Sequence, residues 1–418
     1  MRVFSILLPV WLFVLSAPAA TIPVEEYRAR REALKSALPD AVIVLFGKTD
    51  READDSRAGF FQEPNFNYLT GWREADAVAL LSPAGDTLFL PKRNARWVRY
   101  NGPAPDPEDA AVAARAGFNA VAPAAKFETL LAKALESAPN LYSLAGHPMA
   151  ERLRALAPLR EVKDATPAVA RLRMKKSDRE LSLIRRSTEA SIDAHLAAWK
   201  RAAPGVYEYE SAATFAVALL ERGCGRAAYA SIFGSGPNAL TLHYWQNARR
   251  MDAGDLLLID AAAECDDYAS DITRTIPVGG RFSARQRELY DIVLGAQQAA
   301  IAVVKPGVIH EQGQKGAIYQ AALDYLNAHG KDRQGNPLGR YLPHGISHHV
   351  GLDVHDSFVP GTALEAGMVI TIEPGLYIPD EGIGIRIEDT VRVTGNGCEV
   401  LSARLPREAA RIEKLLAK

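Results

Sequence analysis

The sequence predicts an α+β protein of two domains, a smaller α/β domain followed by a larger domain built on an antiparallel sheet. At 418 residues the chain is longer than one hydrophobic core usually supports. Its first part alternates helical and strand-like patterns, whereas its second part ends in short strands punctuated by Gly and Pro. With 48% hydrophobic and 24% charged residues, the composition is that of an ordinary globular protein.

Residues 1–20 differ from the rest and predict a signal peptide. Arg2 precedes a mostly apolar run over residues 3–15, and small residues follow as far as Ala20. This order is typical of a secretory signal cleaved near Ala19 or Ala20, whereas a spanning helix needs about 20 apolar residues. An uncleaved anchor is the alternative. We expect an exported protein, periplasmic or secreted, that has no membrane segment after the signal is removed.

Residues 21–170 have the pattern of a small α/β domain, and we see no cluster of catalytic residues in its sequence. The strand 41–46 is apolar throughout, and a hairpin over 77–90 turns at the Pro- and Gly-containing stretch 82–86. Helical patterns are expected over residues 24–37, 107–115 and 126–137.

Residues 171–418 form the second predicted domain, and two capping boxes mark its long helices. Ser177 with Glu180 opens a helix that ends before Pro204, and Ser283 with Gln286 opens another that ends before Pro306. Further helices are expected over 208–221 and 312–328, with strands over 227–233 and 256–260 and a series of short strands over 341–403.

Charge and cysteine content exclude several other classes of protein. The formal net charge is -1 and basic residues are interspersed with acidic ones, so no nucleic-acid partner is expected. Cys224, Cys265 and Cys398 are scattered singly, without metal-ligand spacing. One disulfide with one remaining thiol is possible, but buried apolar thiols are the preferred interpretation.

Four carboxylates lie on separate apolar segments of the second domain. Asp260 ends the run 256–260, and Asp271 follows beyond a turn at 266–267 that can bring the two side by side. Glu373 and Glu388 each lie at the end of another apolar strand. A lone buried carboxylate costs several kcal/mol unless a cation or a proton compensates it.

Histidines cluster between these carboxylates, at His344, His348, His349 and His355. Taken singly, each acidic or imidazole group has an ordinary explanation as a turn, cap or core residue. Together, four converging carboxylates and one imidazole, for which His348 is the candidate, favour a site for two divalent metals. Such a ligand set suits Mn, Co or Zn, and bridging carboxylates hold two ions roughly 3.5–4 Å apart.

These segments resemble the pita-bread metallopeptidases, which include methionine aminopeptidase, prolidase, creatinase and aminopeptidase P. The resemblance covers the mature chain and implies a creatinase-like N-terminal domain before the catalytic domain. It implies two divalent ions, with Mn expected and Co or Zn as alternatives. It also implies that Asp271 and Glu388 bridge the two ions. Asp260 would bind one ion, and His348 and Glu373 would bind the other.

The same resemblance implies further roles in the site. His243 and His355 would contact the scissile carbonyl, Arg386 would orient neighbouring groups, and His344 would support the site from outside. His349 is expected to point away. A metal-activated hydroxide would attack the carbonyl before proline, and Glu373 would carry the proton to the departing nitrogen.

The strings over 344–356 and 382–389 resemble aminopeptidase P most closely, which implies a peptide substrate with proline in second position. Prolidase, which cleaves Xaa-Pro dipeptides, shares all five ligands and is the alternative. A metal-free binding protein on the same fold is a further alternative. Creatinase-type enzymes need no metal, so the intact set of ligands argues against them. The resemblance also implies a homodimer or homotetramer, in which the aromatic stretch 60–72 either touches substrate at a neighbouring subunit's site or belongs to the domain core.

Overall fold

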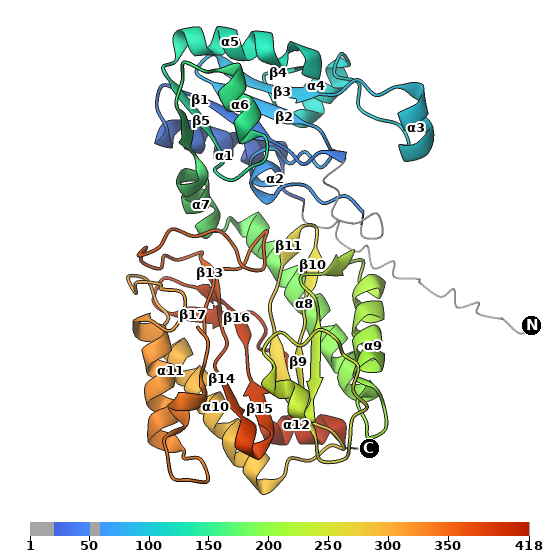
Figure 1. Cartoon of the computed structure of the whole chain (residues 1–418), viewed down its shortest axis with the longest axis vertical. Helices are drawn as coiled ribbons and strands as arrows, with labels where there is room; N and C mark the ends of the chain where they lie inside the picture. Colours follow the sequence, from blue (N-terminus) through green and yellow to red (C-terminus); the bar gives the residue numbers. More distant parts are fainter. Residues whose placement is uncertain (1–20, 51–58, 418) are drawn as a thin grey trace, which may run out of the picture.

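The computed structural model describes residues 21–50 and 59–417, which form two bodies joined by a short helix (Figure 1). The predicted signal peptide, residues 1–20, lies outside the described residues. Within the described part of the chain, no helix combines the length and the apolar character that crossing a membrane requires.

The N-terminal body is built on a mixed sheet. Among the described residues its strand order is β4-β3-β2-β1-β5-β6, with β1 antiparallel to β2 and parallel to β5. The strands are β1 (Ala41–Phe46), β2 (Val78–Ser82), β3 (Gly85–Leu90), β4 (Ala120–Pro123), β5 (Asn140–Ser143) and β6 (Val162–Asp164). The helices are α1 (Val24–Ala37), α2 (Pro64–Thr70), α3 (Ala95–Asn101), α4 (Ala110–Ala116), α5 (Phe127–Ser137) and α6 (Ala150–Leu156).

Strand β1 is apolar at every position because both of its faces are covered. Its alternating side chains divide between two cores. Ile43 packs on one face with Leu34 of α1, whereas Val42 packs on the other with Phe127 and Leu131 of α5. The predicted helix over 24–37, strand over 41–46 and hairpin over 77–90 are confirmed.

A helix that the sequence pattern did not predict, α7 (Thr166–Met174), leads from the first body to the second. The predicted domain boundary at 170/171 falls within it. Tyr68 of α2 donates a hydrogen bond to the carbonyl of Leu172, 3.0 Å away, and Arg30 of α1 forms an ion pair of 3.3 Å with Glu180. The N-terminal body is therefore fixed to both ends of the connection.

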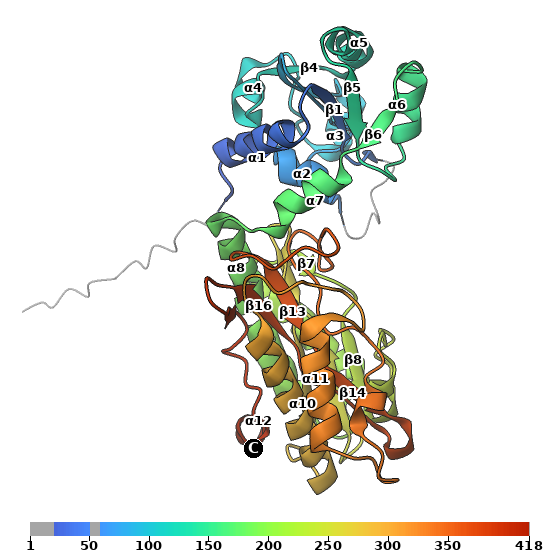
Figure 2. The same cartoon turned by 90° about the vertical axis from the view of Figure 1, so that its left-hand side faces the viewer.

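The second body consists of two helix pairs that run beside short antiparallel strands (Figures 1 and 2). The helices are α8 (Asp178–Arg201), α9 (Glu208–Glu221), α10 (Ala284–Val303), α11 (Gly316–His329) and α12 (Ala409–Leu416). The first strands are β7 (Arg226–Ala227), β8 (Ile232–Ser235), β9 (Leu256–Asp260), β10 (Ala263–Cys265), β11 (Tyr268–Ala269) and β12 (Thr273–Pro277). The later strands are β13 (Val369–Ile372), β14 (Gly375–Ile378), β15 (Ile383–Arg386), β16 (Asp389–Val393) and β17 (Cys398–Val400).

Both predicted capping boxes are present. Ser177 caps α8 with Glu180 and Ser283 caps α10 with Gln286, each through reciprocal hydrogen bonds between side chain and backbone. The single strand predicted over 227–233 is wrong, because the chain bends there and β7 and β8 join different sheets.

The preferred interpretation of three buried thiols is also wrong. Cys224, just after α9, and Cys265, in β10, form a disulfide, and their Cα atoms are 4.5 Å apart. Cys398 remains a half-buried free thiol. The pairing depends on how the segment just after α9 lies beside β10, which single cysteines scattered in a sequence do not reveal.

Candidate metal centre

A cavity of about 460 Å³ lies in the second body, and the predicted ligands line it. Asp260 is the last residue of β9, and it lies opposite Thr273 in the antiparallel pair of β9 with β12. Asp271 comes just before β12, so the register brings the two carboxylates to one end of the sheet. The hydroxyl of Tyr229 lies within hydrogen-bond distance of both, at 2.6 Å from Asp260 Oδ1 and 2.5 Å from Asp271 Oδ1, and can donate its one hydrogen to either.

The remaining predicted ligands come from two loops and a strand junction. His348 lies in a loop whose backbone bonds to Thr371 of β13, and Glu373 directly follows that strand. The Nε2 atom of His348 is 3.4 Å from Asp271 and 3.5 Å from Glu373. Glu388 lies between β15 and β16 and accepts a 2.7 Å hydrogen bond from Thr273.

The structure brings the five predicted ligands into the same cavity, and three of them into a tight cluster. Asp271, His348 and Glu388 each offer a ligand atom, and these atoms all lie within 4.8 Å of one another. All three side chains are buried. Asp260 and Glu373 line the same cavity at its less buried edge.

The buried carboxylates carry more negative charge than the cationic side chain beside them, Arg386, compensates. Burial, together with the neighbouring Asp260, raises the pKa of Asp271 well above its ordinary value. Burial and Asp271 likewise raise the pKa of Glu388, and burial and Glu388 raise the pKa of Glu373. Oxygen donors that repel one another around one imidazole fit divalent cations, which would hold these groups in their charged form.

Arg386 is the cation that faces the cavity. It lies at the end of β15, where it donates to Asp260 Oδ2 at 2.5 Å, to Thr273 Oγ1 at 3.2 Å and to the hydroxyl of Tyr377. Its single charge offsets part of the repulsion among the carboxylates.

The predicted pocket histidines surround this cluster. His243 and His355 line the cavity, and the ring of His355 lies 4.1 Å from that of His348. Burial and the charge of His348 lower the pKa of His355 to about 4. Burial and Arg386 lower the pKa of His344 to about 4, and its Nε2 atom lies 3.1 Å from the Tyr377 hydroxyl. Both imidazoles are therefore neutral at pH 7.

His349, in contrast, packs away from the cavity. Its fully buried ring stacks on Phe358 at 6.0 Å and meets His310 edge-on at 4.8 Å. Two residues at the site, Tyr229 and Tyr377, were not predicted. Each belongs to an apolar-looking stretch, and no spacing distinguishes a tyrosine that bonds to a ligand from a core tyrosine.

Ion pairs with buried side chains hold the loop that carries His355 in place. Arg173, from α7, donates to Asp353 at 2.8 Å and also contacts Asp356, and Lys176 donates to Asp356 at 2.6 Å. Burial opposes the ionisation of Asp356, but Arg173 and Lys176 outweigh it and lower the pKa of Asp356 to about 2. The helix between the two bodies thus fixes one wall of the cavity.

Each of the two bodies matches a known protein family. Residues 182–395 match metallopeptidase family M24, and residues 27–142 match the N-terminal domain of aminopeptidase P. The Xaa-Pro aminopeptidase of Haemophilus influenzae is 34% identical, over 95% of this chain and 98% of its own. The structure of an aminopeptidase from Pseudomonas aeruginosa has a TM-score of 0.87 at 31% identity, covering 95% and 99% of the two chains. Zinc-substituted Escherichia coli aminopeptidase P in complex with product has a TM-score of 0.84 at 30% identity, over 94% and 98%.

Proposed function

The chain belongs to metallopeptidase family M24, and on that premise we propose that it is an Xaa-Pro aminopeptidase, which removes the residue before proline at the N-terminus of a peptide. Membership confirms the predicted fold, a pita-bread catalytic domain behind a creatinase-like N-terminal domain. The alternative of a prolidase is not favoured, because relatives that this chain matches over nearly their whole length, such as those of Haemophilus influenzae and Pseudomonas aeruginosa, are aminopeptidases.

The observation that carries the proposal is the convergence of Asp260, Asp271, His348, Glu373 and Glu388 in one cavity. We propose that these residues hold two divalent cations, with Mn expected and Co or Zn as alternatives. When bound, such ions supply positive charge to the carboxylates and a water molecule that loses a proton near neutral pH.

The remaining side chains of the cavity suit the handling of a peptide bond. His243 and His355 line the cavity, and the neutral ring of His355 can donate a hydrogen bond to the scissile carbonyl. Glu373, which follows β13 and lines the cavity, can take up a proton and deliver it to the departing proline nitrogen. Arg386 keeps Asp260 in place through their 2.5 Å hydrogen bond.

Two further features remain proposals. The disulfide between Cys224 and Cys265 supports export, because such bonds persist in oxidising compartments. We therefore propose a periplasmic or secreted enzyme whose residues 1–20 are removed. The homodimer or homotetramer implied by family resemblance is likewise proposed, and sedimentation of the purified protein tests it.

Peptide hydrolysis tests the main proposal. The Mn-loaded protein is incubated with an Xaa-Pro-Xaa tripeptide and with an Xaa-Pro dipeptide, and release of the first residue is followed by mass spectrometry. The expected result is preference for the tripeptide and loss of activity after chelation, with recovery when Mn is added back. Preference for the dipeptide would identify a prolidase, and cleavage of neither by metal-loaded protein would remove the assignment to proline peptides.

A further inference from the structure

Glu208, the first residue of α9, carries a fully buried carboxylate that does not line the catalytic cavity. Burying a carboxylate is unfavourable unless nearby charges or hydrogen bonds compensate the loss of water. Its own helix contributes part of that compensation, because the N-terminus of a helix favours negative charge. The other groups that compensate Glu208 indicate what this carboxylate holds in place.

The hydrogen-bond donors that meet Glu208 come from the end of β8 and the loop after it. Oε1 accepts from the backbone amide and the hydroxyl of Ser235, at 2.6 and 2.7 Å, and from the side-chain amide of Asn238 at 3.2 Å. Oε2 accepts from the hydroxyl of Tyr244 and from the backbone amide of Arg249, each at 2.8 Å. The backbone amide of Glu208 also donates to the carbonyl of Arg249 at 2.9 Å. One residue therefore ties together both ends and the middle of this loop.

The loop, residues 236–249, carries a histidine into the catalytic cavity and is called the His243 loop below. His243 and Trp245 line that cavity. Their rings stack with centres 6.4 Å apart, so they lie on the same side of the chain. Tyr244, between them, directs its hydroxyl to Glu208 instead. Successive residues thus face the metal centre and the buried carboxylate in turn.

Hydrophobic packing does little to fix the His243 loop. None of the described residues 241–248 is buried, although Leu242 and Tyr244 pack partly against a small apolar cluster. Segments with few buried contacts open easily, so the position of this loop depends on its polar contacts. The hydroxyl of Tyr244 also accepts from the amide of Ala248 at 3.1 Å, which extends the hold of Glu208 to the turn that follows.

We propose that Glu208 is a positioning residue for peptide hydrolysis, which holds the His243 loop so that His243 stays in place at the metal centre. This inference rests on the proposed function, in which the peptide is cleaved in the cavity that His243 lines. Glu208 acts as an acceptor, because the groups that meet its two oxygens are donors. A glutamine would turn its NH2 group toward some of these donors and release part of the loop.

Steady-state kinetics on Ala-Pro-Ala with the Mn-loaded full chain test this proposal. Glu208→Gln should lower kcat/KM by about 10–100-fold, mostly through kcat, as for other groups that orient a reacting residue. Metal content should stay unchanged, because the substitution touches none of the predicted ligands. In a chain that already carries His243→Ala, the same substitution should cost less than about twofold, because the residue that it positions is gone.

Tyr244→Phe is a milder variant that removes one donor and keeps both the aromatic ring and Glu208. We expect kcat/KM to fall by about three- to tenfold, as for the loss of one hydrogen bond. In the His243→Ala chain this loss should also shrink to less than about twofold. Because the variant leaves the buried carboxylate in place, it tests the proposal even if Glu208→Gln yields little folded protein.

Asp86→Asn is the matched control. Asp86 is also a buried carboxylate, but it lies in the N-terminal body, where Arg31 binds it at 2.7 Å, and it does not line the catalytic cavity. The variant should melt at a lower temperature, while kcat/KM of the folded protein stays within about twofold. Full activity of both Glu208→Gln and Tyr244→Phe, or losses that multiply with that of His243→Ala, overturns the positioning role and leaves the proposed function intact. A wild type that cleaves no proline peptide overturns both.

Discussion

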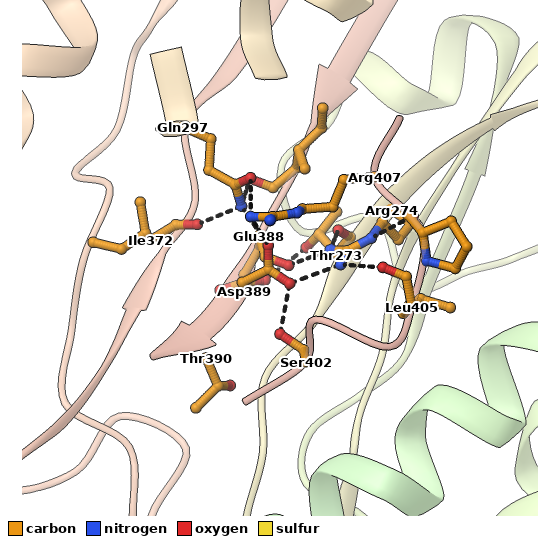
Figure 3. A network of polar contacts seen from close by, with 12 residues as sticks. Thr273, Arg274, Gln297, Ile372, Glu388, Asp389, Thr390, Ser402, Leu405 and Arg407 are labelled. Carbon is orange, nitrogen blue, oxygen red and sulfur yellow. Dashed lines mark hydrogen bonds and ion pairs between the residues drawn. The ribbon is translucent and has the colours of Figure 1, made fainter. Parts of the chain in front are cut away.

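Glu388 and Asp389 are adjacent in the chain and both buried, yet their surroundings are opposite, and Figure 3 shows the polar network around Asp389. Asp389 accepts hydrogen bonds from Arg274 at 2.7 Å, Ser402 at 2.5 Å, Gln297 at 3.0 Å and Arg407 at 3.2 Å. The side chain of Glu388 instead lies in the candidate metal centre, with Asp271 and His348.

The difference separates a structural charge from a functional one. Asp389 has its compensating charges built into the fold, and Arg274 also donates to the backbone carbonyl of Glu388. Glu388 has a 2.7 Å hydrogen bond from Thr273, but burial and Asp271 raise its pKa. A carboxylate left without its countercharge in a rigid frame is one that an external cation can complete.

The largest expected effect comes from Glu388→Gln. We expect hydrolysis to fall by more than about 100-fold, since even groups that only support a metal ligand are worth 10–100-fold. The metal-free variant should fold and melt no lower than the metal-free wild type, because the substitution removes a repelling charge. Activity assays, metal analysis and calorimetry check this, and a variant that keeps full activity contradicts the site.

Asp389→Asn should lower the stability of the protein but leave metal binding intact, which is the reverse of the result expected for Glu388→Gln. Removing one partner of a buried ion pair typically costs about 3–5 kcal/mol, because the other charge is left uncompensated. We expect the free energy of unfolding to fall by about that amount, with metal still bound below the new melting temperature. Chemical denaturation with metal analysis measures both quantities. A loss of metal without a loss of stability would show that the two carboxylates do not divide their roles in this way.

Arg173→Met extends the comparison to charges that position the site. The variant removes the contacts to Asp353 and Asp356 but keeps much of the side-chain volume, so the loop of His355 should loosen. We expect kcat to fall by about tenfold, as for groups that act through another residue, with metal content unchanged. Arg173→Lys should restore part of the rate. An equal fall in metal content and kcat would instead indicate general destabilisation.

The smallest expected effect is a pH dependence of the metal-free protein. The folded-state pKa of Glu388 is raised above its ordinary value of 4.5, so the stability linked to it is fully present below that pH. It is lost as pH rises through the folded-state pKa, because folding then buries a charge. The free energy of unfolding of the wild type, relative to Glu388→Gln, should therefore fall as pH rises above about 4.5. Saturating Mn should abolish this fall with pH in the wild type, because bound cations compensate the charge of Glu388.

Many helices and strands of this fold can be predicted from short sequence patterns, because interactions between residues close in the chain determine where they begin. The capping boxes at Ser177 and Ser283 begin helices wherever an apolar periodic run follows them. The ligand carboxylates stand out for a related reason, since an acid at the end of an apolar strand conflicts with its neighbours. That conflict is visible without any three-dimensional information.

What the sequence hides depends on contacts between distant segments. Tyr229 is an ordinary aromatic residue until β9 and β12 bring Asp260 and Asp271 to its hydroxyl. The disulfide depends on the segment after α9 lying beside β10, and the break between β7 and β8 depends on the separate sheets that each joins. Such features follow from contacts between distant segments, which the periodicity of apolar residues in the sequence does not reveal.

The scattering of the ligands along the chain also has a biosynthetic consequence. Asp260 and Asp271 emerge from the ribosome well before Glu373 and Glu388, and only the folded second half brings the four together. A nascent or truncated chain therefore holds no assembled centre, and loading with metal is a late step in maturation. Peptidase activity is thereby withheld until the folding of the catalytic body is complete.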